Sequence, residues 1–282
     1  MTQQSVRERV LGSRKNKLKP AWRFKAAGVL WRVVPTPSGN LIGEARNLEE
    51  KRVEFFCLNR KTGELLWDGK SFGEQWWIGI EALAADTLFL HKYTTPELPE
   101  HQGLIAVDVH TGNELWCDTE VRFLSAQART VNVLRRGQEG VETVALDCRS
   151  GNVVPASAAR GEAPLHTSEF PQLVFDLFTS RSSMNDLMRQ HCSEGTLVGP
   201  VESLATARHL IICHHERNAS STHDQQRLAT ILHVLDRNDG AVLFSETLQR
   251  DSTAVVPENF FVENDMLFFI SERSTLTAIH LD

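Results

Sequence analysis

The sequence contains few of the residues and motifs that would assign a chemistry to the protein. Its cysteines are five, an odd number, and they form neither a CxxC pair nor an adjacent pair, so neither a structural disulfide nor a zinc site is expected. They are Cys57, Cys117, Cys148, Cys192 and Cys213. No Walker loop, GxSxG elbow, HExxH motif or EF-hand pattern occurs. We therefore predict no catalytic residue, no cofactor and no metal ligand.

Long apolar segments are also missing. No apolar run approaches the length of about eighteen residues that a membrane helix requires, and none follows the polar, basic N-terminus as a secretory signal would. The hydrophobic share of 41% and the charged share of 23% are those of an ordinary soluble protein. A chain of 282 residues can bury a sizeable core as one large all-β domain or as two smaller domains. A cytoplasmic location is expected.

Charge is distributed unevenly along the chain. The formal net charge is -6, yet residues 1–25 carry eight Lys and Arg against Glu8 alone. We expect residues 1–19 to form a basic flexible arm and residues 20–282 to form a single domain. The arm either meets an anionic surface, such as nucleic acid, lipid headgroups or an acidic protein, or is a solvated leader that lies on its own acidic domain.

A short phrase recurs along the sequence. The segments "FFCLNRKTGELLW", "LIAVDVHTGNELW", "TVALDCRSGNVVP" and "LHVLDRNDGAVLF" share an apolar run, an Asp or Asn, and a glycine four positions later. These acidic or amide residues and glycines are Asn59 and Gly63, Asp108 and Gly112, Asp147 and Gly151, and Asp236 and Gly240. The glycines are separated by 49, 39 and 89 residues, and the last interval corresponds to two units. The chain therefore contains an internal repeat.

Each position of the phrase has a mechanical reason. The Asp or Asn side chain can accept backbone N–H bonds across a turn, and glycine supplies the positive φ that a short bulged hairpin requires. Four residues after the glycine an aromatic recurs at Trp67, Trp116 and Phe244, which suits a ring packed between neighbouring sheets. We interpret all these residues as structural.

The phrase resembles the repeat of the quinoprotein-like β-propeller superfamily, which includes the pyrroloquinoline-quinone dehydrogenases and non-enzymatic relatives. The resemblance covers residues 58–67 and 107–116 and, more weakly, 146–155 and 235–244. It implies an all-β propeller with a repeat of about 40 to 50 residues per blade. Quinone-binding members have larger rings, export signals and a vicinal disulfide, so quinone is not an expected cofactor here.

Strand patterns predict four strands per blade, A to D in chain order, with the recurrent turn between C and D. The length predicts six blades, with five or seven as alternatives. The last segment, "LTAIHLD", ends at a C strand, so an N-terminal strand containing Trp22 is expected to complete the last blade and cover its open edge. Residues 157–200 are irregular. There "SSMNDLMRQHC" predicts a helix with Ser183 and Asp186 as a capping box, either an insertion packed on the blades or a partner-binding element.

The long polar B–C loops, "TTPELPEHQG" and "ERNASSTHDQQR", are the expected place for function, at the mouth of the propeller channel. The histidines near them are His91, His101, His214, His215 and His223. Within "CHHE" neighbouring side chains of a strand point to opposite faces, so at most two metal ligands converge, whereas a catalytic zinc uses three. These histidines therefore form a candidate surface site without a metal.

Two functions remain compatible with the sequence. The first is a non-enzymatic cytoplasmic interaction scaffold whose partner is another protein, because propeller signals occur without a reaction motif. The alternative is an enzyme or a small-ligand-binding protein with a site at the channel mouth, formed by the B–C and D–A loops.

Overall fold

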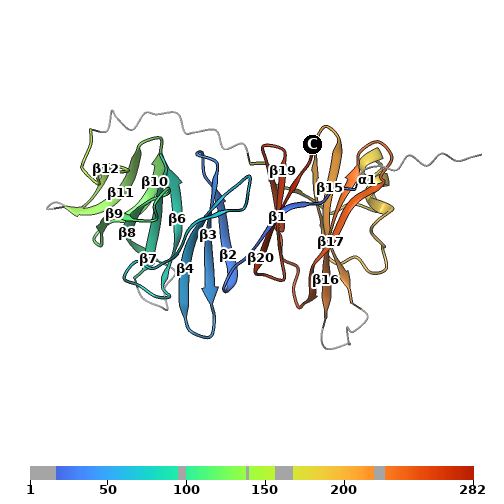
Figure 1. Cartoon of the computed structure of the whole chain (residues 1–282), viewed down its shortest axis with the longest axis horizontal. Helices are drawn as coiled ribbons and strands as arrows, with labels where there is room; N and C mark the ends of the chain where they lie inside the picture. Colours follow the sequence, from blue (N-terminus) through green and yellow to red (C-terminus); the bar gives the residue numbers. More distant parts are fainter. Residues whose placement is uncertain (1–16, 95–99, 138–139, 156–167, 219–225) are drawn as a thin grey trace, which may run out of the picture.

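The fold is all-β and consists of blades of the propeller type, as predicted, but these blades do not close into the expected ring (Figure 1). The structure is a computed structural model, which describes residues 17–94, 100–137, 140–155, 168–218 and 226–282. These residues form twenty strands in five antiparallel sheets and one helix. No helix among them is long and apolar enough to cross a membrane. We refer to the sheets as blades I to V.

Blades I and II have the expected four strands in chain order. Blade I consists of β2 (Val29–Pro35), β3 (Asn40–Asn47), β4 (Arg52–Asn59) and β5 (Leu65–Lys70). Blade II consists of β6 (Ile78–Ala84), β7 (Thr87–Tyr93), β8 (His101–Asp108) and β9 (Glu114–Asp118). Blade III has three strands, β10 (Arg122–Gln127), β11 (Thr130–Gly137) and β12 (Gly140–Asp147). Its D position is reduced to an isolated bridge between Leu146 and Val153.

Blades IV and V depart from the simple order. Blade IV has five strands, β13 (Gln172–Val174), β14 (Val201–Ala205), β15 (His209–Arg217), β16 (Leu228–Asp236) and β17 (Val242–Ser252). Blade V consists of β18 (Phe260–Glu263), β19 (Met266–Ser271) and β20 (Thr275–His280), completed by β1 (Pro20–Lys25). In the β1–β20 ladder Trp22 is opposite Ala278 and Phe24 is opposite Leu276. The prediction that an N-terminal strand completes the last blade is confirmed.

The core lies between neighbouring blades. Four apolar clusters join blade IV to V, V to I, I to II and II to III, and a fifth lies between blade IV and helix α1 (Ser183–Arg189). The side chains with the largest volume among those fully buried are Phe55, Phe89, Phe260, Phe268 and Phe269. Each blade is therefore stabilised mainly by burying apolar side chains against the next one.

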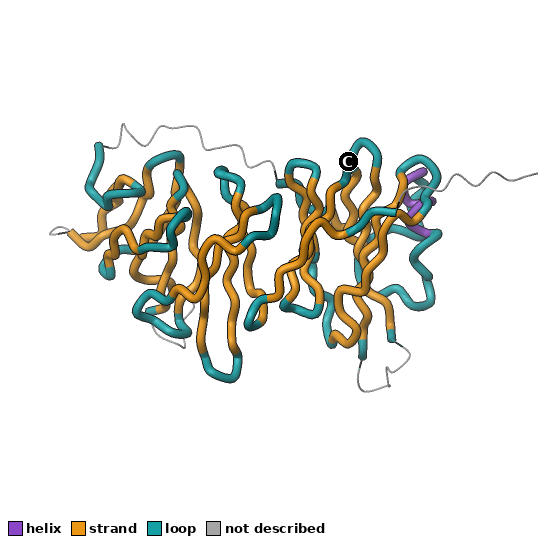
Figure 2. The backbone as a smooth tube through the Cα atoms, in the orientation of Figure 1, coloured by secondary structure: helices purple, strands orange, loops and turns teal. Residues whose placement is uncertain are grey.

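The blades form an open series in the order IV, V, I, II, III (Figure 1). Blades III and IV are consecutive in the chain, yet they lie at opposite ends of the longest axis. The strands cross the molecule from one loop-bearing side to the other, and the helix lies at one end (Figure 2). Strand β1 is thus one of the contacts by which blade V meets blade I, beside the packing of their side chains and the hydrogen bond from the backbone N–H of Leu30 to the carbonyl of Arg273.

A repeated contact joins three of these junctions. The indole of Trp67 lies against the turn of blade II, and its Nε1 donates to the carbonyl of Val109 at 2.8 Å. Trp116 makes the same contact with the turn of blade III, and Trp22 makes it with the turn of blade I. The predicted aromatic packing between sheets is therefore observed.

The turns themselves are as predicted. Gly63, Gly112, Gly151 and Gly240 have φ angles of 70°, 67°, 70° and 72°. Each glycine N–H donates to the carbonyl of the Asp or Asn four residues before it, which is Asn59, Asp108, Asp147 or Asp236. The side chains of these four residues also accept backbone N–H bonds across the turn.

The contact between a tryptophan and the turn of the next blade is missing between blades III and IV. Helix α1 lies over the turn of blade IV, where Leu187 and Gln190 approach Gly240. At the junctions of blade I with II and of blade II with III, the tryptophan four residues after the turn glycine of one blade covers the turn of the next blade. Blade III has Pro155 at this position, so no indole covers the turn of blade IV. Phe244 of blade IV instead contacts Phe269 of blade V, with ring centroids 5.9 Å apart. The helix therefore covers the end of the series.

The described residues form five sheets, one of the alternatives to the six blades most expected, because residues 168–200 contribute only the short β13 and the helix, while a count based on length assigned them a blade. The predicted capping box is wrong. The helix is capped by Ser182, whose side chain accepts from the backbone N–H of Asn185. Ser183 is already helical, and Asp186 pairs with Arg189 instead of serving a capping box. The predicted basic arm falls largely on residues 1–16, which lie outside the described residues.

Candidate functional site

The histidines singled out in the sequence do not form one site. His91 ends up beside His101 in blade II, whereas His214 and His215 lie on β15 in blade IV. His223 lies outside the described residues. The candidate set therefore divides into two separate environments.

The first environment is a carboxylate–imidazole cluster in blade II. The rings of His91 on β7 and His101 on β8 are stacked, with centroids 3.5 Å apart and an angle of 5° between their planes. Glu81 on β6 lies next to both: its Oε2 is 2.7 Å from Nδ1 of His101 and 3.1 Å from Nδ1 of His91. Burial raises the pKa of Glu81, but its contacts with the two imidazoles lower it more, so the pKa is lowered overall.

Sequence reasoning missed Glu81, and the reason is a β-bulge. The register between β6 and β7 shifts between Ile80 and Ala82, so Glu81 is the extra residue. A bulge re-aims a side chain without leaving a clear mark in the sequence. The only available signal was a charged residue within the apolar run "IGIEALA".

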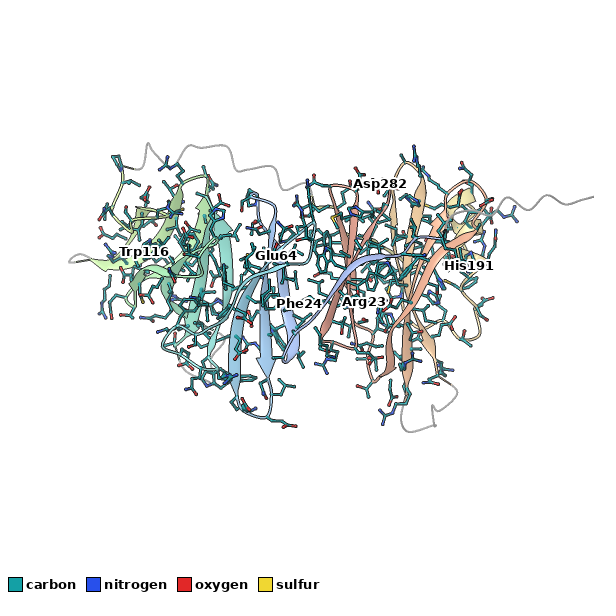
Figure 3. The ribbon with its side chains drawn as sticks, viewed as in Figure 1. Arg23, Phe24, Glu64, Trp116, His191 and Asp282 are labelled. Atoms are coloured by element: carbon teal, nitrogen blue, oxygen red, sulfur yellow. The ribbon has the colours of Figure 1, made fainter. Side chains whose placement is uncertain are left out.

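The second environment is a buried histidine cluster in blade IV. The ring centroid of His214 is 5.5 Å from that of His233 on β16, and His191, which follows helix α1, is 5.6 Å from His233. His191 lies at the end of the molecule opposite Trp116 (Figure 3). His215 points to the other face of the strand, as predicted, where its Nε2 accepts from the backbone N–H of Val256.

This cluster predicts acid sensitivity. Burial, reinforced by neighbouring imidazoles, lowers the pKa values of His214 and His233 to about 4. Below the ordinary value of 6.5, the unfolded chain therefore takes up protons that the folded protein excludes, and stability is lost as the pH falls from 6.5 toward 4. We expect the free energy of unfolding to fall by about 3 kcal/mol between pH 6.5 and 5 from these two groups. Urea denaturation across this range measures it.

The variant His214→Gln isolates the effect, since other groups titrate in the same range. Its pH dependence should be about half as steep in this interval, while His280→Gln, at an exposed position, should match the wild type. An unchanged slope in His214→Gln would show that the buried imidazoles do not control acid stability.

A groove centred on Trp31 is a third candidate site. Trp31 lines three cavities, of about 580, 350 and 230 Å³. The first lies between β2 of blade I and the end of β17 with the segment that leads to β18, and the second lies between β2 and the residues of β18 and β19 in blade V. The third runs toward blade II and ends at the Glu81 cluster. We refer to the three together as the Trp31 groove.

Trp31 is itself the residue of a β-bulge. The register between β2 and β3 shifts between Leu30 and Arg32, and the first strand of blade III has the same shift around Leu124. Trp31 is 60% exposed and Leu124 is 46% exposed. The first strands of blades I, II and III thus each carry a bulge, and its residue is Trp31, Glu81 or Leu124.

Buried polar contacts fix the exposed indole. The guanidinium carbon of Arg46 lies 5.3 Å from the centroid of a ring of Trp31. Arg46 is held by Glu44 Oε1 at 2.6 Å and by the carbonyl of Ile78 at 2.7 Å. Because the cation is buried and each of its three nitrogens donates a hydrogen bond, it offers a firm support to the indole.

The opposite wall of the groove, which contains Glu258 and Asn259, is fixed by a buried carboxylate. Glu202 on β14 is 2% exposed, and its carboxylate accepts from the backbone N–H groups of Glu258 and Asn259. Asn259 also donates its side-chain amide to Glu202 at 3.0 Å. Next to the segment that contains Glu258 and Asn259, Phe170 is 57% exposed, and its ring centroid lies 5.9 Å from that of Phe261. The groove therefore has rigid walls that carry exposed apolar side chains.

The edge of blade V in this groove already pairs with an extended segment. Glu169 and Val262 exchange two backbone hydrogen bonds, of 2.7 and 2.9 Å. The edge of β18 is therefore already paired with backbone at Val262.

Comparison with known proteins gives limited matches. A model of the family described as "Domain of unknown function (DUF4905)" matches residues 34–116, which extend from the end of β2 into β9. The match covers less than a third of the chain and is not to a quinoprotein family. No curated protein matches the chain.

Solved structures resemble the chain only distantly. Bifunctional GH43-CE from Bacteroides eggerthii has a TM-score of 0.31 at 9% identity, over 95% of this chain and 34% of that one. BBS1N, solved in complex with ARL6DN, has a TM-score of 0.26 at 10% identity, over 89% of this chain and 64% of that one. The Dos1 propeller has a TM-score of 0.27 at 10% identity, over 94% and 96%. The chain thus spans about a third of GH43-CE and under two thirds of BBS1N, and these likenesses assign it no function.

Proposed function

We propose that this protein is a non-enzymatic interaction scaffold that binds a protein partner in the Trp31 groove. The observation that carries the proposal is the exposed indole of Trp31 at the junction of three cavities. Tryptophan is the residue type most enriched among those that dominate binding energy, and a rigid aromatic loses little entropy on binding.

The chemistry of the groove favours a partner with an extended apolar segment. Trp31, Phe170 and Val256 expose apolar surface, while Arg273 and Asp251 supply charges of both signs at the rim. The pairing of Glu169 with β18 is the type of contact that an added strand makes. All five cysteines are free thiols, which supports a reducing compartment, and we propose the cytoplasm.

The variant Trp31→Ala tests this function. Affinity-tagged protein would be cross-linked in cells of its source and the partners quantified by mass spectrometry. We expect Trp31→Ala to lose a partner that the wild type retains, with recovery lower by about 30-fold, the effect of about 2 kcal/mol at an interface centre. Its melting temperature should not change, because the side chain is 60% exposed.

Leu124→Ala is the matched control. Leu124 occupies the equivalent bulge of blade III and is 46% exposed, but it does not line the three cavities. Equal loss of the partner in both variants, or full retention in Trp31→Ala, would contradict the proposal.

The alternative function is the binding or turnover of a small ligand. The cluster of Glu81, His91 and His101 at one end of the groove favours it, since paired imidazoles beside a carboxylate can exchange protons with a ligand. If His101→Gln loses a bound small ligand that Trp31→Ala retains, the result would support this alternative over the scaffold.

A further inference from the structure

We propose that Glu81, His91 and His101 form a binding site for a divalent first-row transition metal ion, with zinc as the reference ion. One potential ligand atom from each of the three residues lies within 4.8 Å of the others. The residues come from three consecutive, hydrogen-bonded strands, β6, β7 and β8, so the blade itself holds them together. The inference is independent of the protein-binding function and departs from the sequence-based expectation of no metal.

The state of His91 is the second, independent observation. Its side chain is 7% exposed, and neither ring nitrogen has a partner with hydrogen-bond geometry. Nδ1 lies 3.1 Å from Glu81 Oε2, but that contact lacks the required direction, while His101 makes a good hydrogen bond to the same oxygen at 2.7 Å. An imidazole buried without partners costs free energy, and coordination of an ion would remove this cost.

A cavity beside the cluster gives an ion a route to it. Gly79 packs closely against the ring of His91, because a Cβ atom at this position would lie 3.1 Å from Cε1 and 3.2 Å from Nε2 and would crowd the ring. The cavity of about 230 Å³ opens beside His101, whose side chain is 37% exposed. An ion could therefore enter from the groove and retain a water molecule.

The neighbouring charges of the cavity have partners of their own: Arg32 donates to the carbonyl of Ile80 and Arg46 donates to the carbonyl of Ile78. Glu44 lines the same cavity, but its two carboxylate oxygens are occupied by Arg46 and by the backbone N–H of Ile80. The ion would replace the proton that His101 shares with Glu81. Because the stacked rings are parallel, one imidazole must turn about its Cβ–Cγ bond for both lone pairs to converge, and the half-exposed His101 has the freedom to do so.

The donor set indicates the type of ion. Two imidazole nitrogens and one carboxylate oxygen suit zinc and its first-row neighbours, whereas calcium and magnesium prefer oxygen ligands alone. Three protein ligands leave a fourth position open to water.

Zinc titration of the full-length, EDTA-dialysed protein tests the site. We expect isothermal calorimetry to show one equivalent of zinc bound with a Kd below about 10 µM. Glu81→Gln and His101→Gln should each weaken binding by about 100-fold or more. His110→Gln is the control in the same blade, since His110 is exposed and faces a single carboxylate, Asp86, at 3.7 Å. Cobalt absorption in the visible range would identify imidazole coordination.

Circular dichroism of each variant separates loss of the site from loss of the fold, and the exposed position of His101 makes His101→Gln the variant that best preserves structure. The proposal is overturned if the folded wild type binds no equivalent of zinc at 100 µM, or if binding survives in the double variant Glu81→Gln/His101→Gln. It is likewise overturned if His110→Gln loses zinc as strongly as His101→Gln.

Discussion

A chain that begins after Lys25 is expected to lose most of its stability, whereas a chain that begins at Lys17 is expected to fold normally. Strand β1 pairs with β20 from Pro20 to Lys25 and completes blade V. Strand β1 also contacts blade I. There Trp22 Nε1 donates to the carbonyl of Arg60 at 3.0 Å, and the ring of Phe24 packs on the ring of Phe56. Phe24 and Arg23 lie on the strand that crosses between the two halves (Figure 3).

The expected magnitude follows from what is removed. Loss of a buried tryptophan costs about 3 to 5 kcal/mol, and removal of a whole ladder adds a bare sheet edge. Because the blades form an open series, deletion of β1 also removes part of the packing between blade V and blade I, to which β1 contributes Trp22 and Phe24. We expect the truncation at residue 25 to aggregate or to unfold in much less urea than the wild type.

Deletion of residues 1–16 is the control. It leaves Leu18, whose backbone N–H donates to the carbonyl of Leu243 at 3.0 Å, and removes only a polar, basic segment. Its urea midpoint should equal that of the full chain. Equal midpoints for both truncations, measured by circular dichroism and size-exclusion chromatography, would refute the role assigned to β1.

Gly112→Ala is expected to destabilise the protein by about 3 kcal/mol, more than a turn glycine usually costs. Two effects combine at this position. The φ of 67° strains any residue with a Cβ atom, and that atom would lie 2.7 Å from Cδ2 of Trp67. The indole cannot retreat easily, because its Nε1 is held by the carbonyl of Val109.

Gly73→Ala separates the two effects. Gly73 has a φ of 70°, but a Cβ atom there would meet nothing within 4 Å, so only the backbone strain of about 1 kcal/mol is expected. The free energies of unfolding of the two variants, from urea denaturation, give the cost of the steric clash by difference. If Gly112→Ala costs no more than Gly73→Ala, the indole does not lock the two blades together.

The recurrent turn could be predicted from the sequence because its causes are local. Asp108 and Gly112 lie four residues apart, and the hydrogen bonds that form the turn are made within this span. The pairing of β1 with β20 could also be predicted. The repeat leaves the last blade one strand short, and the N-terminal region contains a strand pattern with Trp22 in the matching position.

The candidate sites were harder to predict from the sequence, because β-bulges and distances between strands determine which side chains meet. Glu81 reaches His91 and His101 through an extra residue in β6, and Trp31 is exposed by the same irregularity in β2. Bulges depend on how two strands align over their whole length, which no short window of sequence contains. His214 shows the opposite case: its place on one face of β15 was predicted, but its burial against His233 was not.

The repeating unit of this protein could be derived from its residues alone: the antiparallel blade, its turn, and the strand that completes blade V. The number of blades and the place where the series opens depend on packing between distant segments. Residues 168–200 contain enough chain for most of a blade, yet they give β13 and a helix that packs over Gly240 in place of an indole. The physical reason is that turns arise from contacts a few residues apart, whereas the order of blades and the Trp31 groove arise from side chains that meet only after distant strands have packed.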